Sequence, residues 1–174
     1  PPPVLNPISY HRIKCAMKAV KFWNTVGRPL TAPLIAWSNI EKASDELTAF
    51  EDKETGEVPK LRKVNQVLTY IDELSNHLDT CKSSRDVKAP LSYVTRDDAV
   101  VPAAAPALAN NQPFAEEYGS CVDELKSRAS HGHHMFTVDN REVFEILMKG
   151  LQGTVLEGTI SSFQKTYDGR SAWL

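Results

Sequence analysis

The apolar residues between positions 67 and 81 recur at alternating intervals of four and three residues. The row comprises Val67, Ile71, Leu74, Leu78 and Cys81. Because an α-helix has about 3.6 residues per turn, this spacing places all five side chains on one face. A helix of this kind is stable in water mainly when its apolar face packs against another element. The stretch therefore predicts an amphipathic helix within a helical fold.

The preceding residues carry two further helix patterns. The first helix is expected to begin with Asn6 as its N-cap and Pro7 in its first turn, and to end before Gly27. Its expected apolar stripe consists of Tyr10, Ile13, Met17, Val20 and Trp23. The second helix is expected to start near Thr31 or Ala32, with one side formed by Leu34, Trp37, Ile40, Leu47 and Phe50. A charged loop over residues 51–56 should follow it.

Prolines then interrupt the helical pattern. Pro90 ends the first half, and Leu91–Thr95 is expected to form a short extended piece. Pro102, Pro106 and Pro113 punctuate an Ala- and Asn-rich run, and ordinary helices do not tolerate that density of proline. We interpret this run as a linker or an extended arm.

Helix signals return in the last third of the chain. Ser120 is expected to cap a helix that runs through Arg128. Asp139 and Glu142 form a capping pair before an apolar row that Gly153 should end, and Asp168 is expected to cap a final helix. A short helix that carries Leu156, Ile160 and Phe163 should lie between them.

These patterns predict a mainly α-helical protein with three regions. Residues 1–90 should form a helical region of about three helices, residues 91–118 a Pro- and Ala-rich linker or arm, and residues 119–174 a helical region truncated at its end. Apolar residues make up 41% of the 174 residues, which is enough for a core. Both chain ends are expected to be cut from a longer product.

The composition also indicates where the protein resides. The three cysteines, Cys15, Cys81 and Cys121, are widely spaced and form no CxxC pair, which favours free thiols in a reducing, cytoplasmic compartment. No stretch approaches the roughly 20 apolar residues that a membrane span requires. We therefore expect neither a disulfide framework nor a membrane segment.

Catalytic and metal-binding signatures are weak. His131, His133 and His134 lie close together, but a tetrahedral zinc site needs further ligands at defined spacing, and Cys121 has no paired thiol. The sequence contains no phosphate-binding glycine loop and no G-x-S-x-G nucleophile motif. We expect no enzyme activity, no cofactor and no small-molecule substrate, although a metal-dependent enzyme built on the three histidines is an alternative hypothesis.

One charge feature points to nucleic acid. Residues 1–40 contain no Asp or Glu, although the net charge of the whole chain is -2. Lys14, Lys18 and Lys21 share a helical face, and basic helix faces can neutralise phosphates. The candidate nucleic-acid contacts in this region are Arg12, Lys14, Lys18, Lys21 and Arg28. The strongly acidic residues 41–57 that follow offer a second interpretation, in which the two stretches lie near each other or are simply solvated.

Several short phrases resemble a known family in order and rough spacing. They lie at Gly27–Ala32, Val58–Leu61, Pro90–Arg96, Val101–Ala109, Glu116–His131, Asp139–Phe144, Ile160–Gln164 and Asp168–Trp173. Together they resemble the gag-like N-terminal region of copia-type retrotransposon polyproteins, especially those of diatoms and related algae. The chain lacks the Cys- and His-containing zinc knuckle that commonly binds RNA in complete gag proteins, and it lacks the D-[ST]-G of the aspartic protease.

The resemblance implies a helical structural protein that self-associates into particles and packages RNA. We therefore expect a gag-like segment that acts by helix packing and oligomerisation, with weak RNA contact through the basic first helix. The alternative is a nucleic-acid-binding regulatory protein that uses the same basic helix.

Overall fold

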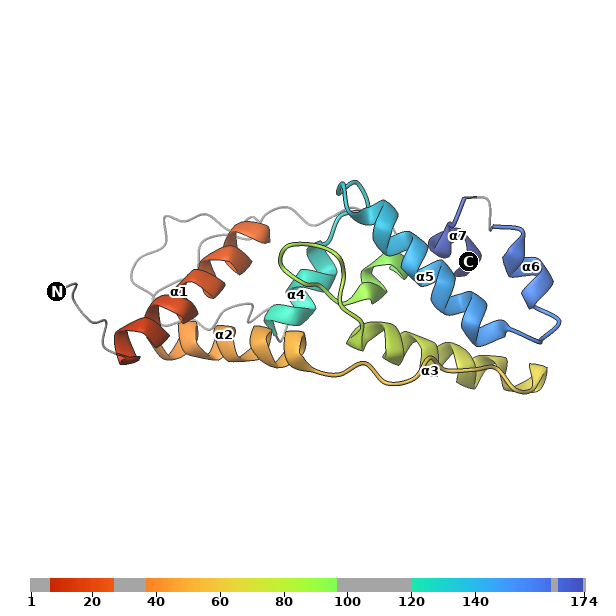
Figure 1. Ribbon diagram of the computed structural model, residues 1–174, viewed down its shortest axis with the longest axis horizontal. Coiled ribbons are helices and arrows are strands. Elements are labelled where there is room, and N and C mark those ends of the chain that lie inside the picture. Colours follow the sequence, from red (N-terminus) through yellow and green to blue (C-terminus); the bar gives the residue numbers. More distant parts are fainter. Residues whose placement is uncertain (1–6, 27–36, 97–119, 164–165, 174) are drawn as a thin grey trace. The chain divides into compact units, whose positions relative to one another are not determined.

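The structure is a computed structural model that describes residues 7–26, 37–96, 120–163 and 166–173 (Figure 1). This part of the chain is mainly α-helical, which confirms the predicted fold class. Its α-helices are α1 (Pro7–Thr25), α2 (Trp37–Asp52), α3 (Val67–Thr80), α4 (Cys121–Arg128), α5 (Phe136–Leu151), α6 (Glu157–Ser161) and α7 (Gly169–Trp173). Two 3₁₀ helices, η1 (Val64–Gln66) and η2 (Leu91–Thr95), complete the described helices.

The contacts between these helices group them into two compact units. Helices α1, α2 and α4 belong to the first unit, whereas α3, α5, α6, α7 and both 3₁₀ helices belong to the second. This grouping differs from the division at residues 90 and 118 that the sequence suggests. Two helices account for the difference. Helix α4, which follows the proline-rich run, packs with α1 and α2, whereas α3 packs against η2 in the second unit.

The first unit is a three-helix packing arrangement. Helix α1 contacts α2 and α4, and α2 also contacts α4. The buried side chains include Phe22 on α1, Leu47 on α2 and Leu125 on α4. The Cys121 backbone N–H donates to the Glu46 carboxylate at 3.1 Å, which ties the start of α4 to α2. Apolar burial and this hydrogen bond both hold α4 in the unit.

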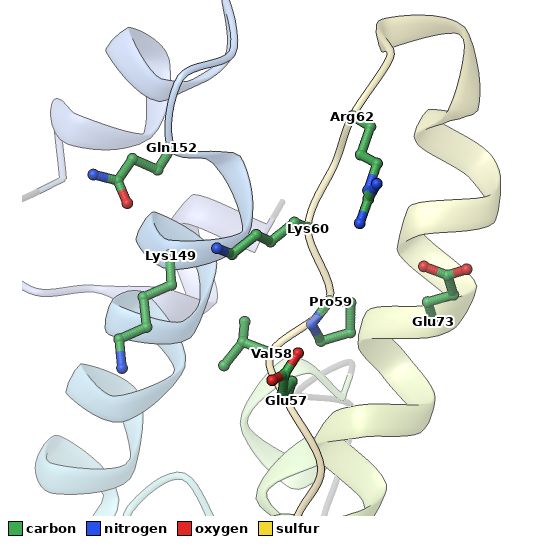
Figure 2. A pocket seen from close by; sticks show the side chains of 8 residues that line it. All are labelled: Glu57, Val58, Pro59, Lys60, Arg62, Glu73, Lys149 and Gln152. Atoms are coloured by element: carbon green, nitrogen blue, oxygen red, sulfur yellow. The ribbon is translucent and has the colours of Figure 1, made fainter.

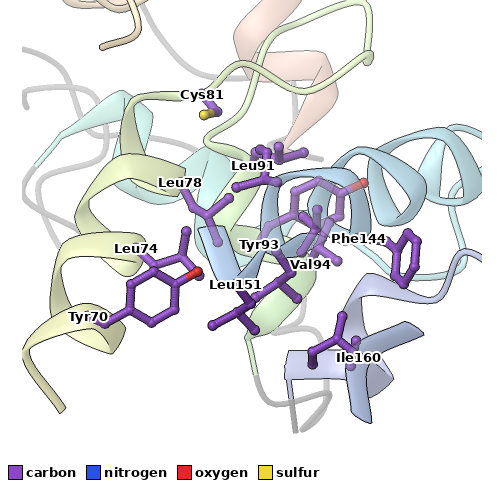
Figure 3. Close-up of a cluster of buried hydrophobic side chains, with 14 of the residues drawn as sticks. Tyr70, Leu74, Leu78, Cys81, Leu91, Tyr93, Val94, Phe144, Leu151 and Ile160 are labelled. Atoms are coloured by element: carbon purple, nitrogen blue, oxygen red, sulfur yellow. The ribbon is translucent and has the colours of Figure 1, made fainter. Parts of the chain in front are cut away.

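The second unit is built around a larger apolar core, part of which Figure 3 shows. Helices α3, α5 and α7 all contact the 3₁₀ helix η2. Leu91, Tyr93 and Val94 of η2 are fully buried between them. The expectation of an extended piece at Leu91–Thr95 was therefore wrong. Short apolar runs cannot be assigned by periodicity alone, and here the backbone closes tight turns, with Tyr93 N donating to the Pro90 carbonyl at 3.1 Å.

Several expected helix boundaries are confirmed, whereas the expected starts at Asn6 and at Thr31 or Ala32 lie outside the described residues. Ser120 caps α4, because its hydroxyl oxygen accepts from the Asp123 N–H at 3.1 Å. Asp168 caps α7 by accepting from the Ser171 N–H at 3.1 Å. Gly153 follows α5 with a φ of 81°, a left-handed conformation that glycine adopts without steric cost. Helix α2 extends through Asp52, two residues into the expected loop.

Asp139 does not cap α5, contrary to expectation. The helix begins at Phe136, so Asp139 lies inside its first turn and is fully buried. Its carboxylate accepts from the Tyr93 hydroxyl at 2.6 Å and from the Ser84 N–H at 2.7 Å. The sequence pattern of a cap was present, but tertiary hydrogen bonds use the carboxylate instead.

Candidate association surface

Helix α1 packs into the first unit through one face. Its buried residues are Cys15, Ala19, Phe22 and Trp23, and Val26 directly after the helix is also buried. The small side chains of Cys15 and Ala19 allow a neighbouring helix to approach closely, while the two aromatic rings supply most of the buried area. This face is the one that contacts α2 and α4.

The apolar stripe that the sequence pattern assigned to the core lies mostly on the surface. Tyr10, Ile13, Met17 and Val20 are between 45% and 61% exposed, and we call these four residues the α1 outer stripe. Only Trp23 of the expected stripe is buried. Met17 and Ala19 are two positions apart, which corresponds to about 200° around a helix axis. Helix α1 is therefore apolar on two opposite faces, and one of them is open to solvent.

The basic residues of α1 have different surroundings. Lys18 donates to the Thr48 hydroxyl at 2.6 Å and forms an ion pair with Glu51 at 3.0 Å. The Arg12 guanidinium lies over the Trp37 ring, 4.9 Å from its centroid. The four proposed nucleic-acid contacts that the structure describes therefore do not form one uniform phosphate-binding surface.

Lys14 and Lys21 border the α1 outer stripe more closely. Both side chains are exposed, and the Lys14 ammonium lies 4.9 Å from the centroid of the Tyr10 ring. Met17 is three positions after Lys14 and four before Lys21, so all three share one side of the helix. Arg28, the remaining proposed contact, lies outside the described residues.

A hollow of about 460 Å³ lies between the basic side of α1 and helix α2. Its lining includes His11, Lys14 and Lys18 from α1, and Asp45 from α2. His11 lies 3.8 Å from the Glu41 carboxylate on α2. Acidic groups on α2 thus offset the cations of α1 here, as the alternation of basic and acidic stretches in the sequence indicated.

The second unit exposes another apolar row, which was not identified from the sequence as a surface. Val64 of η1 and Leu68 and Ile71 of α3 are exposed, with Leu68 reaching 80%, and we call them the α3 outer stripe. Leu74, Leu78 and Cys81 are buried as predicted, but Ile71 of the same expected stripe is not. The i, i+4, i+7 spacing of Val64, Leu68 and Ile71 was the available sequence signal.

The α3 outer stripe borders an apolar groove of about 140 Å³. Ile71 belongs to both, because it also lines the groove with Val67 and Leu74 of α3. Leu156 of the α5–α6 connection and Trp173 of α7 also line it. The exposed apolar surface of the second unit therefore continues into a depression instead of ending at the helix edge.

Figure 2 shows a larger hollow in the second unit, of about 860 Å³, with charged walls. Lys60, Arg62 and Lys149 line it together with Glu57 and Glu73. Charges of both signs surround this space, and its residues come from the segment before η1, from α3 and from the end of α5. Such a mixed lining gives no preference for a ligand of one charge.

The three histidines lie in a loop before α5. The His131 imidazole Nε2 lies 2.8 Å from the Tyr93 carbonyl oxygen, and its ring packs 4.9 Å from that of Phe136. The rings of His133 and His134 pack against each other at 4.2 Å. Partial burial, and then the nearby Arg85 guanidinium, lower the pKa of His133. Within the described residues, no three His, Cys, Asp or Glu side chains are grouped so that they could hold a metal ion.

The three cysteines are buried and none of them forms a disulfide, in agreement with the expectation of thiols without disulfides. Burial raises the pKa of the Cys81 thiol to about 11, and the Glu142 carboxylate contributes to this shift. The thiolate, which is the nucleophilic form, is therefore disfavoured at neutral pH. Cys81 serves as a small apolar residue of the second core.

Comparisons of the chain with models of protein families, with curated proteins and with solved structures found no match. Among the described helices, none is both long and apolar enough to cross a membrane. The surfaces described above therefore carry the functional argument.

Proposed function

We propose that this chain is a structural segment that self-associates through helix packing. The observation that supports the proposal is the second apolar face of α1, formed by Tyr10, Ile13, Met17 and Val20. A helix on the surface of a globular protein normally has one apolar face and one polar face. Contiguous exposed apolar residues are typical of surfaces that bind another protein.

The resemblance of the sequence to a gag-like region supports a more specific proposal. The chain is part of the structural region of a copia-type retrotransposon polyprotein, and copies assemble through exposed helix faces. Its function is then structural and not catalytic. An assembly protein needs stable helices that leave apolar surface available for association, and α1 has that arrangement.

Replacement of Met17 by Asp tests the proposal. Met17 is the most exposed residue of the α1 outer stripe, so the substitution leaves the core of the first unit intact. Sedimentation velocity over a wide range of protein concentration should show that wild type associates and that Met17→Asp is monomeric. Val138→Asp is the matched control, since Val138 is a similarly exposed apolar residue on α5. A wild-type protein that stays monomeric at every concentration would refute the proposal.

RNA contact by α1 is the second candidate function. It is favoured by the exposed side chains of Lys14 and Lys21 on a helix that contains no Asp or Glu. Each phosphate contact to single-stranded RNA contributes about 0.7 to the slope of log affinity against log salt concentration. The variant Lys14→Glu/Lys21→Glu should therefore reduce that slope by about 1.4, whereas Lys63→Glu in the second unit should not. Binding of RNA that is insensitive to salt would exclude this role.

A further inference from the structure

The two outer stripes have matching spacings. The α1 outer stripe extends from Tyr10 to Val20, and the α3 outer stripe extends from Val64 to Ile71. In both, the apolar residues recur every three or four positions, so each presents a straight ridge along two to three helical turns. The α3 stripe also lies beside the apolar groove, which provides a depression for side chains of a partner helix.

The charges of the two helices are opposite. Helix α1 carries one arginine and three lysines and no acidic residue, whereas α3 carries Asp72, Glu73 and Asp79 and no lysine or arginine. Lys14 and Lys21 lie along one edge of the α1 outer stripe, next to Met17. Asp72 is exposed and follows Leu68 by four positions, so it lies on the next turn beside the α3 outer stripe.

We propose that the α1 outer stripe of one copy packs against the α3 outer stripe of a second copy of this chain. The inference rests on the proposed self-association and names the two surfaces that meet. Pairing of α1 with α1 would bring the cations of two copies together, and juxtaposed like charges disfavour a contact. Pairing of α1 with α3 instead places the lysines of α1 near the Asp72 carboxylate, beside the apolar contact.

This contact joins two different surfaces, so it is heterologous. Each copy in a pair retains one unused α1 stripe or one unused α3 stripe, which can bind a further copy. Repetition of such a contact gives a closed ring or an open filament, depending on the rotation between copies. A contact of two to three helical turns is smaller than a standard interface of about 800 Å² per partner, so association should depend strongly on concentration.

Complementation between two single variants tests the inference. Met17→Asp removes the α1 surface and Leu68→Lys removes the α3 surface, and both residues are exposed. Each variant alone should be monomeric at concentrations where wild type forms larger species. An equimolar mixture should form a 1:1 complex and nothing larger, because each copy contributes its one intact surface.

The outcomes separate this inference from the proposed function. If wild type is monomeric, self-association itself fails. If wild type associates but Leu68→Lys associates equally well, or if the mixture stays monomeric or grows beyond 1:1, the α1–α3 pairing is overturned while self-association stands. Circular dichroism of each variant verifies that the helices are intact.

A charge exchange provides an independent test that leaves the apolar contact in place. Asp72→Lys should weaken self-association about two- to fivefold, which is the effect of one exposed ion pair. Lys14→Glu should weaken it to a similar degree. In a mixture of the two variants, α1 of the Lys14→Glu copy can pair with α3 of the Asp72→Lys copy. This pairing restores opposite charges at the two positions, so the mixture should recover part of the affinity. An equal loss in the mixture and in each variant alone would contradict the pairing.

Discussion

Gly150 lies in the last turn of α5, where the segment that contains Pro59 and Leu61 passes close to the helix backbone. The Leu61 backbone N–H donates to the Gly150 carbonyl oxygen at 2.8 Å, which holds the crossing segment against the helix. A Cβ atom at position 150 would overlap the Tyr70 hydroxyl oxygen and lie 2.7 Å from the Pro59 carbonyl oxygen. Gly150→Ala is therefore expected to destabilise the second unit, although alanine is the better helix former.

The size of the effect follows from two opposing contributions. Alanine stabilises a helix interior by about 1 kcal/mol relative to glycine. Overpacking of a closed site costs about 1–3 kcal/mol, and here one obstacle is a backbone carbonyl that cannot rotate away. Taking the upper value gives a net loss of about 2 kcal/mol in the free energy of unfolding. For a domain of this size the loss lowers Tm by about 8–16 °C.

Thermal unfolding followed by circular dichroism measures this loss. Gly158→Ala is the matched control, because nothing lies within 4 Å of a Cβ atom there, and its Tm should be unchanged or slightly raised. Tyr70→Phe removes a hydroxyl that is buried without a hydrogen-bond partner in the described part of the chain, so it should be neutral or stabilising. In that background the Gly150→Ala penalty should shrink. A Gly150→Ala protein as stable as wild type would show that the close approach is not present in solution.

Three further perturbations have defined outcomes. Burial raises the pKa of Glu142, and the Asp139 carboxylate raises it further, so the ionised side chain destabilises the folded state at neutral pH. Glu142→Gln should therefore raise Tm at neutral pH. The difference in Tm from wild type should disappear below about pH 4, where Glu142 is protonated in both the folded and the unfolded state. Asp139→Asn should cost about 1.5–3 kcal/mol in urea unfolding, because the buried carboxylate accepts from Tyr93 and Ser84, and an unchanged urea midpoint would argue against this network. Ser120→Ala should cost about 1 kcal/mol and accelerate amide hydrogen exchange in the first turn of α4, whereas equal exchange rates would show that the cap contributes nothing.

Local sequence signals identified most of the helices because they depend on neighbouring residues. Ser120 and Asp168 cap helices through hydrogen bonds to residues three positions ahead, and Gly153 ends α5 through its own backbone conformation. Asp139 had the same kind of signal and was misassigned. Its carboxylate accepts a hydrogen bond from Tyr93, which lies 46 residues earlier. A pattern in neighbouring residues cannot predict a partner so far away along the chain.

The candidate surfaces show the same limit. Periodicity located an apolar stripe on α1 but could not determine which of its two apolar faces would be buried. That choice depends on α2 and on α4, which both contact α1, and α4 lies beyond the proline-rich run. On α3, the buried row and the exposed Val64, Leu68 and Ile71 lie on adjacent sides of the helix, and contact with η2 covers only the first of them.

The sequence by itself determined that the protein is helical and where several of its helices begin or end, because helix periodicity and capping act over three to seven residues. Only the tertiary structure decided which apolar faces enter a core and which stay at the surface. That decision rests on contacts between residues far apart along the chain, since an apolar face is buried only where another element is available to cover it.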